Sequence, residues 1–272
     1  MNRICLAIAL CLTPLAAQAA DLPPRIAQNG IVAAIVPNYP PLDVRDPATN
    51  ALTGFDVQLG EAIAKQLGVK LTWQETSFDQ MIPAVQTGRV DIILSGMSDL
   101  ASRHGAISFV DYMKSGPEFF VLASHAKEFP DILSLCGKSV GASRRTSFPK
   151  EIAAWSDAHC VPAGRPPISF VGTEGSPDAR TQLKQGRIDA AVQGNETLPY
   201  VMGQEPDTYA AVGEPIGSQL TGIGVGRDDT ALQQALAGAI DALIKDGTYQ
   251  KLLDKWQLSA EAIPQATINA GQ

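Results

Sequence analysis

Residues that commonly take part in catalysis are few in this chain and form no active-site pattern. The three histidines, His104, His125 and His159, lie far apart, and none has a carboxylate at metal-ligand spacing. The sequence also lacks a G-x-S-x-G elbow, an H-E-x-x-H pair and a Walker loop. The glycines of Gly222–Gly226 are too closely spaced for a dinucleotide fingerprint, so we interpret them as a hinge or strand bend. We therefore predict no catalytic residue, no metal and no cofactor.

The amino-terminal segment has the pattern of a secretory signal. One charge, Arg3, precedes an apolar run, which ends at Ala17-Gln18-Ala19, the small-x-small pattern of a signal-peptidase site. A membrane anchor is the alternative, but the run is shorter than the roughly 20 apolar residues that a span needs. We predict a signal peptide over residues 1–19 and a periplasmic location.

Removal of that segment leaves two of the four cysteines, Cys136 and Cys160. Two thiols in an oxidising compartment usually pair, although two buried free cysteines are the alternative. A bond across 24 residues would close a loop worth roughly 3 kcal/mol in the chain-entropy model.

Composition excludes one class of partner. The 272 residues are 45% hydrophobic, which is enough for a real core, and they contain 21 basic and 28 acidic residues. Residues 20–272 retain 20 of the basic residues and all 28 acidic ones. Because no basic excess is present to neutralise phosphates, nucleic acid is not expected as a partner.

An internal repeat indicates how the chain is organised. Ala84–Gly96 is repeated 98 residues later as Gln182–Gly194, and both copies contain Gly-Arg-(Val/Ile)-Asp. Each copy reads as a helix end, a capping glycine, a short apolar strand and a glycine-containing loop. Coincidence is the alternative, but the shared tetrapeptide favours duplication and hence two similar α/β lobes.

Alternating strand and helix patterns surround these repeats. Strands are predicted at 31–36, 69–73 and 223–225 and helices at 56–67, 231–244 and 249–256, while 131–135 and 140–143 open the second series. We assign residues 20–122 and 220–272 to the first lobe and 123–219 to the second, with hinge crossings near 121–125 and 213–221. Open α/β sheets bind ligands beyond the carboxyl ends of their strands. The loops after Val36, Leu94, Val140 and Val192 should therefore face one cleft.

Several short segments, in this order and spacing, resemble the periplasmic solute-binding proteins of ABC importers for polar amino acids, family 3. The resemblance spans residues 31–258. The segments that carry it are Pro37–Pro41, Leu52–Val57, Ile82–Asp91, Gly96–Ser98 with Arg103, Phe109–Tyr112, Leu135–Val140 and Asp246–Tyr249. It implies a two-lobed, periplasmic-binding-protein-like (Venus flytrap) fold that binds a small amino acid or related carboxylate and delivers it to an ABC permease in the inner membrane. We expect a monomer with no enzymatic activity, and the two remaining cysteines match a family bridge in the second lobe.

The resemblance also implies a ligand site. Arg103 matches the arginine that grips the ligand α-carboxylate, which a guanidinium fork can do bidentately. Ser95, Gly96 and Ser98 match the loop that supplies a carbonyl for the ligand amine and donors for its carboxylate. An exposed helix arginine is the alternative reading of Arg103.

Two further pairs complete this implied site. Thr146 and Ser147 match a helix start in the second lobe whose N–H groups complete the carboxylate cradle. Tyr39 and Phe78 match aromatic walls around the ligand side chain, with ordinary core packing as the alternative.

Some positions depart from the family pattern. The family commonly has an Asp for the ligand ammonium where this chain has Gly194; either Glu196 supplies that carboxylate instead, or the ligand lacks the amine. Val36 replaces an acidic residue of binders for basic amino acids, which argues against Lys, Arg or His. Arg144 and Arg145 would favour an anionic ligand if either faces the cleft, and are otherwise solvated surface arginines. A periplasmic cyclohexadienyl dehydratase-like enzyme, with Glu196 as general acid, is the alternative function.

Overall fold

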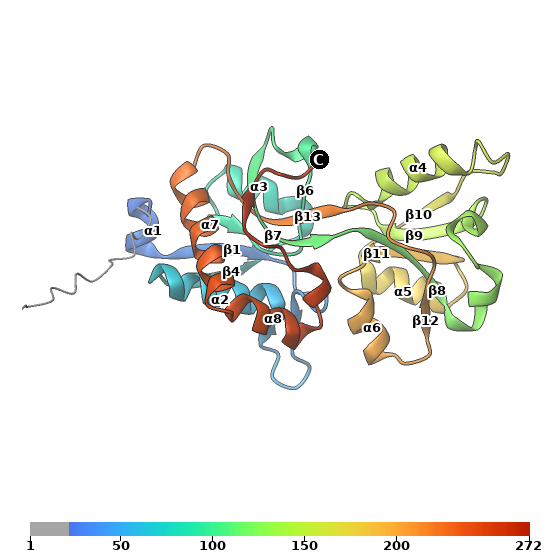
Figure 1. Ribbon diagram of the computed structural model, residues 1–272, viewed down its shortest axis with the longest axis horizontal. Helices are drawn as coiled ribbons and strands as arrows, with labels where there is room; N and C mark the ends of the chain where they lie inside the picture. Colours follow the sequence, from blue (N-terminus) through green and yellow to red (C-terminus); the bar gives the residue numbers. More distant parts are fainter. Residues whose placement is uncertain (1–21) are drawn as a thin grey trace, which may run out of the picture.

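The computed structural model describes residues 22–272, so the predicted signal peptide over residues 1–19 lies outside the described residues. The chain forms two α/β lobes, each built around its own sheet, which lie side by side and are joined by crossing segments (Figure 1). This arrangement confirms the predicted two-lobed α/β fold with hinge crossings.

The first lobe contains both ends of the described chain (Figure 1). Its sheet has the order β14 (Thr267–Ile268), β7 (Ile107–Ser115), β13 (Gln219–Gly226), β5 (Ile92–Ile93), β1 (Ile31–Ile35) and β4 (Leu71–Glu75), with β6 (Ser98–Asp99) also paired to β13. A small hairpin comprises β2 (Val44–Arg45) and β3 (Leu52–Thr53). The helices of this lobe are α1 (Pro24–Asn29), α2 (Phe55–Leu67), α3 (Met81–Gln86), α7 (Thr230–Lys245) and α8 (Thr248–Trp256), with 3-10 turns η1 (Phe78–Gln80), η2 (Ala101–Arg103) and η5 (Ser259–Glu261).

Local sequence explains the best-defined helices of this lobe. Helix α2 ends at Gly68, whose left-handed conformation satisfies the last carbonyls of the helix. Helix α7 begins after Asp229, whose side chain accepts a hydrogen bond from the N–H of Leu232. Apolar faces of both helices, including Leu59 and Leu236, are buried in one core with the sheet.

The second lobe is formed by the middle of the chain. Its sheet has the order β10 (Ser169–Thr173), β9 (Ser139–Ser143), β11 (Ala190–Gly194), β8 (Pro117–Leu122) and β12 (Tyr209–Ala211). The helices are α4 (Phe148–His159), α5 (Ser176–Lys184) and α6 (Leu198–Gln204), with 3-10 turns η3 (Ala123–Glu128) and η4 (Ile132–Leu135). Strands β9, β10 and β11 are mutually parallel, whereas β8 and β12 are antiparallel to their neighbours.

The repeated tetrapeptide has the same structural role in both lobes. Its glycines, Gly88 and Gly186, follow α3 and α5 with φ of 69° and 66°. The Asp91 carboxylate accepts a hydrogen bond from the N–H of Val32 at 2.8 Å, and the Asp189 carboxylate accepts one from the N–H of Ser139 at 2.8 Å. Each aspartate therefore fixes the start of its own strand to the neighbouring parallel strand, β1 in the first lobe and β9 in the second. This equivalence supports the interpretation of the repeat as a duplicated unit.

The first crossing differs from the prediction. Strand β7 ends at Ser115 in the first sheet and β8 begins at Pro117 in the second, so the chain changes lobe at Gly116. The predicted crossing at 121–125, and the lobe boundary at residue 122, are too late in the chain. The return crossing leads into β13 at Gln219, within the predicted range of 213–221.

The glycine-rich segment Gly222–Gly226 lies within β13. The strand pairing shifts register between Thr221 and Gly222, as expected of a strand bend. It forms no turn between a strand and a helix, and so has no geometry for binding a dinucleotide.

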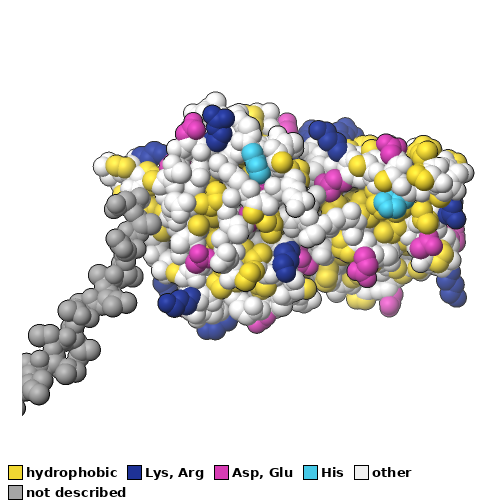
Figure 2. All heavy atoms as spheres, turned by 45° about the horizontal axis from the view of Figure 1, so that its top comes forward, with side chains coloured by type: hydrophobic (Ala, Val, Ile, Leu, Met, Phe, Trp, Pro, Cys, Tyr) yellow, Lys and Arg dark blue, Asp and Glu magenta, His cyan; other side chains and the backbone are white. Residues whose placement is uncertain are grey.

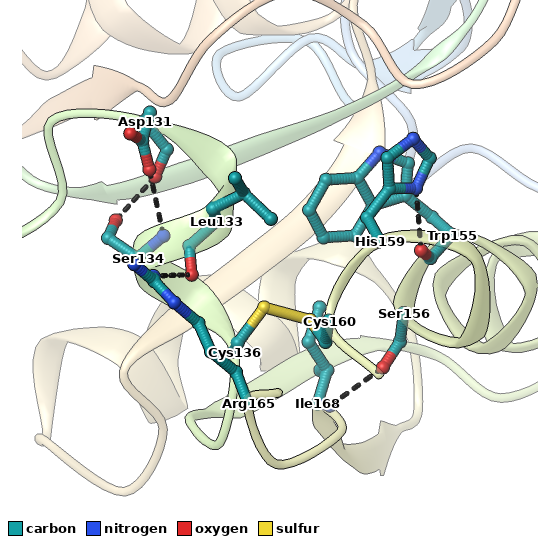
Figure 3. Close-up of a disulfide and its surroundings, with 10 residues drawn as sticks. All are labelled: Asp131, Leu133, Ser134, Cys136, Trp155, Ser156, His159, Cys160, Arg165 and Ile168. Atoms are coloured by element: carbon teal, nitrogen blue, oxygen red, sulfur yellow. Dashed lines mark hydrogen bonds between the residues drawn. A yellow bond between two sulfur atoms is a disulfide. The ribbon is translucent and has the colours of Figure 1, made fainter. Parts of the chain in front are cut away.

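A disulfide joins Cys136, just after η4, to Cys160, at the end of α4 (Figure 3). The Cα atoms are 5.6 Å apart, within the usual range for such a bond. Close by, the rings of Trp155 and His159 stack with centroids 4.6 Å apart. The bond ties the far end of α4 to the segment that precedes β9.

Charge is mixed over the surface. Figure 2 shows basic and acidic side chains interspersed on the face drawn, with no broad basic area that would suit a phosphate backbone. Within residues 22–272, every helix is too short or too polar to traverse a lipid bilayer.

Candidate functional site

A cavity lies between the two lobes and encloses about 820 Å³ of space free of protein atoms, part of it open to solvent. The nine predicted ligand-binding residues all line it, namely Tyr39, Phe78, Ser95, Gly96, Ser98, Arg103, Thr146, Ser147 and Glu196. They come from the loops after strands of both sheets. This placement is expected, because open α/β sheets bind ligands beyond the carboxyl ends of their strands. That these residues bind a ligand remains a prediction.

Glu196 is the buried acid of the cavity, with 4% of its surface exposed. It lies in the turn after β11, and its carboxylate accepts hydrogen bonds from the hydroxyls of Tyr39 at 2.9 Å and Ser115 at 2.7 Å. Burial raises the pKa of Glu196, and the two hydroxyl donors oppose this rise. The Tyr39 hydroxyl also accepts a hydrogen bond from the N–H of Gly194 at 3.0 Å. The carboxylate is thus held in one position by both lobes.

Gly194 leaves the space that this carboxylate occupies. A Cβ atom on residue 194 would come 2.0 Å from Oε1 and 2.3 Å from Oε2 of Glu196. Any side chain at 194 and the observed position of Glu196 therefore exclude each other. The Glu196 carboxylate lies where a side chain of residue 194 would begin, which explains how a turn without the family aspartate still presents an acid to the cavity.

Arg103 is a partly buried cation at the wall of the cavity. It lies in η2, and its guanidinium donates a hydrogen bond to the carbonyl of Ser98 at 2.6 Å. The guanidinium also lies over the ring of Phe78, 6.0 Å from its centroid. Burial lowers the pKa of Arg103, while the negative charges of Glu151 and Asp99 oppose that effect. The side chain is therefore held as a cation at the wall of the cavity.

Two predicted donors of the Ser95–Ser98 loop are engaged within the first lobe. The Ser95 hydroxyl donates to the Asp43 carboxylate at 2.9 Å, and the N–H of Gly96 donates to the Asp56 carboxylate at 2.8 Å. Both aspartates are fully buried. Gly96 has φ of 59°, and a Cβ there would lie 3.0 Å from the Tyr39 ring. The loop is thus fixed from behind, so of its three predicted residues the Ser98 side chain is left to face a ligand.

The second lobe contributes the start of α4 to the cavity. The Thr146 hydroxyl donates to the carbonyl of Ser143 at 2.9 Å and accepts from the N–H of Phe148 at 3.3 Å. Ser147 precedes the helix without a side-chain cap. The positive end of the helix therefore faces the cavity, an arrangement that suits an anionic group.

A cluster of four charged side chains lies at the rim of the cavity. Arg145 lines the cavity, and its guanidinium is 3.2 Å from Glu174 and, across the cleft, 3.9 Å from Asp79 in the first lobe. Arg144 is 2.7 Å from the other Glu174 oxygen and donates to the carbonyl of Gly172 at 2.6 Å. Of the two arginines, only Arg145 faces the cleft. We call Asp79, Arg144, Arg145 and Glu174 the rim cluster.

Several lining residues were missed by sequence reasoning. Glu174, Gly175 and Ser176 follow β10, an edge strand whose first residues are exposed and show no apolar run. Had a strand been predicted there, the loop after its carboxyl end would have been expected at the cleft for the same reason. Ser115 also escaped prediction, because its contact with Glu196 joins residues 81 positions apart.

The fold and site together define a class: two-lobed α/β proteins with a polar cavity for a small solute between the lobes. A sequence profile described as "Bacterial extracellular solute-binding proteins, family 3" matches residues 31–259. The chain belongs to this family. It is 31% identical to the L-arginine-binding protein of Pseudomonas aeruginosa over 257 residues, covering 92% of this chain and 93% of that protein.

Two solved structures are similar in fold. An ancestral arginine-binding protein bound to arginine has a TM-score of 0.73 and 29% identity, covering 83% of this chain and 97% of that one. An ancestral amino acid-binding protein, described as a precursor of cyclohexadienyl dehydratase, has a TM-score of 0.74 and 26% identity, covering 85% and 97%. These similarities support a binding protein of the amino-acid type.

Proposed function

We propose that this chain is the periplasmic substrate-binding component of an ABC importer, that it binds a small α-amino acid in the interlobe cavity, and that it delivers it to the permease. Arg103 from the first lobe, partly buried, and Glu196 from the second, fully buried, are opposite charges that line one cavity. This pair supports the proposal because an α-amino acid is a zwitterion that needs one cation and one anion.

The mechanism follows from the division of these groups between the lobes. Arg103 pairs with the ligand carboxylate, which the start of α4 also faces, and Glu196 pairs with the ligand ammonium. A ligand can contact both lobes only when they are closed, so binding shifts the population towards the closed form that a permease would recognise. The protein acts as a monomer in this scheme, which light scattering after size exclusion tests.

Isothermal titration with amino acids tests the site. Arg103→Ala and Glu196→Gln should each weaken binding by about ten- to a hundredfold or more, because each removes a charge-assisted hydrogen bond worth roughly 1.5–3 kcal/mol. Arg227→Ala is the control, since Arg227 lies outside the cavity and its side chain is 57% exposed. Unchanged binding by Arg103→Ala would disprove the assigned role of Arg103.

The dehydratase alternative makes a different prediction for the same preparation. Both hydroxyls donate to the Glu196 carboxylate and oppose the rise in its pKa that burial causes, so the geometry is that of a hydrogen-bond acceptor. We therefore expect no phenylpyruvate when micromolar protein is mixed with prephenate. Turnover under these conditions would favour the enzyme.

A further inference from the structure

The charges that line the cavity show which ligand side chains it can accept; this inference rests on the proposed amino-acid function. Among the described residues lining the cavity, the charged ones are Arg103, Arg145, Glu174 and Glu196. Arg103 and Glu196 match the α-carboxylate and the α-ammonium. The ligand side chain is then left with Arg145, Glu174 and the uncharged lining residues.

The rim cluster has no free charge for that side chain. The two Glu174 oxygens each face one guanidinium, Arg144 at 2.7 Å and Arg145 at 3.2 Å. A cationic side chain that reached Glu174 would meet two like charges beside it. An anionic side chain that reached Arg145 would likewise meet Glu174 and Asp79, the latter 3.9 Å from the guanidinium.

The rest of the wall is uncharged. Val36, Phe78 and Phe148 provide apolar surface from both lobes, and Phe148 is itself 7% exposed. Hydroxyl and amide groups of Ser77, Asn38 and other uncharged residues are interspersed among them. Transfer of a third charge into this wall would cost free energy with no partner to offset it.

We propose that the protein selects α-amino acids with uncharged side chains, and that Arg145 enforces this choice by occupying Glu174 at the cavity rim. Arg145 is a specificity residue in this arrangement. Arg144 pairs with the same Glu174 carboxylate from outside the cavity. Substitution of Arg144 therefore removes the same charge one residue away and is a matched control.

Isothermal titration of protein freed of bound ligand tests this proposal. The panel contains glutamine, methionine, leucine and phenylalanine as uncharged ligands, arginine and lysine as cations, and glutamate as an anion. We expect at least one uncharged amino acid to bind ten times more tightly than any charged one. Tighter binding of arginine, lysine or glutamate would overturn the inference while leaving the proposed function intact, whereas binding of no amino acid would contradict the proposed function itself.

The two arginine variants test the role of Arg145. Arg145→Ala should lower the Kd for arginine, relative to the best uncharged ligand, by about tenfold, because it frees the Glu174 oxygen at the cavity. Arg144→Ala should change that ratio by less than about threefold. Equal effects of both substitutions, or no effect of Arg145→Ala, would overturn the assignment of Arg145. Both side chains are about half exposed, so circular dichroism should show folded proteins in each case.

Discussion

Gly194 shows how a single residue can set the chemistry of the cavity. Its lack of a side chain allows the Glu196 carboxylate to lie within 2.4 Å of where a Cβ would be. Thr197 secures the same turn, since its hydroxyl donates to the carbonyl of Gly194 at 2.7 Å. The acid of the site thus depends on a glycine two positions earlier, and the two residues must change together.

Gly194→Ala tests this dependence. The new methyl group overlaps the carboxyl group of Glu196, so it should displace that side chain and break its hydrogen bonds to Tyr39 and Ser115. We expect a loss of about 1–3 kcal/mol of stability and at least tenfold weaker amino-acid binding. Thermal unfolding and isothermal titration measure the two effects.

Gly203→Ala in α6 is the matched control for this substitution. A Cβ at Gly203 meets no atom within 4 Å, and the position is helical, where alanine is preferred to glycine. Stability should stay the same or rise slightly. If the two substitutions have equal effects, the contact with Glu196 does not determine the identity of residue 194.

At the scale of elements, the disulfide constrains a large part of the second lobe. The Cys136–Cys160 bond (Figure 3) closes a 24-residue segment that contains β9 and all of α4, the helix whose start faces the cavity. A double Cys136→Ser, Cys160→Ser variant should lose roughly 3 kcal/mol of unfolding free energy. Urea unfolding, followed by circular dichroism, measures this loss.

The expected effect on ligand binding is smaller. The bond joins the far end of α4, whereas Thr146 and Ser147 lie at its start, so the folded variant should keep its amino-acid affinity within a few-fold. An unfolding free energy equal to that of the native protein would show that the bond does not stabilise this lobe.

The carboxy-terminal segment is held by two buried aspartates of the first lobe. Asp111 accepts hydrogen bonds from the Thr267 hydroxyl at 2.6 Å and the N–H of Ala270 at 3.4 Å. Asp99 accepts one from the N–H of Gly271 at 2.7 Å and is 2.5 Å from the His104 ring. Burial, and then the nearby charge of Asp99, raise the pKa of Asp111 to about 7.

This raised pKa predicts a pH dependence of stability. Between an unfolded pKa of about 3.9 and the folded value near 7, the folded state holds a proton that the unfolded state has released. The contribution of Asp111 is therefore largest at acid pH, is lost as pH rises towards 7, and is constant above it. Asp111→Asn keeps an acceptor for Thr267 and cannot ionise. The fall in melting temperature from pH 5 to pH 8 should be smaller in this variant than in the native protein.

Asp228→Asn is the control for this pH effect, because Asp228 is 91% exposed. Its melting temperature should follow the native pH profile. An unchanged profile for Asp111→Asn would mean that Asp111 does not titrate in this range.

Elements with local signals were predicted well. The predicted helix at 56–67 and strand at 31–36 agree closely with α2 and β1, because Gly68 and a short apolar run mark their ends. The first crossing was predicted too late, although Gly116-Pro117 interrupts the pattern between β7 and β8, because long-range pairing decides which sheet each strand joins: β7 pairs with β13 and β8 with β11. The β10 loop was missed because an exposed edge strand has no buried pattern.

For the site too, the sequence indicated which residues line the cavity but not which distant residues they contact. Residue positions around the cavity followed from the family resemblance. What the groups contact did not: Ser95 and Gly96 bind Asp43 and Asp56, which are 52 and 40 residues away in the sequence. A pattern of residue types cannot show that a donor is already occupied by such a distant partner.

At the scale of the whole molecule, contacts across the cleft hold the lobes together. The Tyr39 hydroxyl of the first lobe donates to Glu196 and accepts from the N–H of Gly194, both in the second lobe. Near the crossings, the Asn195 amide donates to Glu261 at 3.0 Å, and the Gln219 amide donates to Glu151 at 2.7 Å. These bonds favour the closed arrangement even before any ligand contributes. Ligand affinity should therefore depend on them as well as on direct contacts.

Tyr39→Phe tests this dependence, because it removes the two hydrogen bonds across the cleft and keeps the aromatic wall. The equilibrium between open and closed lobes should shift towards open, and the apparent Kd should rise by about ten- to a hundredfold, since one lost bond is to a buried carboxylate. Small-angle scattering should give a larger radius of gyration for the ligand-free variant than for the ligand-free native protein, and equal values once both are saturated. Tyr200→Phe, outside the cavity in α6, is the control and should match the native protein in both measurements. Equal radii for the ligand-free proteins, together with a weakened Kd, would assign the Tyr39 hydroxyl to direct ligand binding and contradict its role in closure.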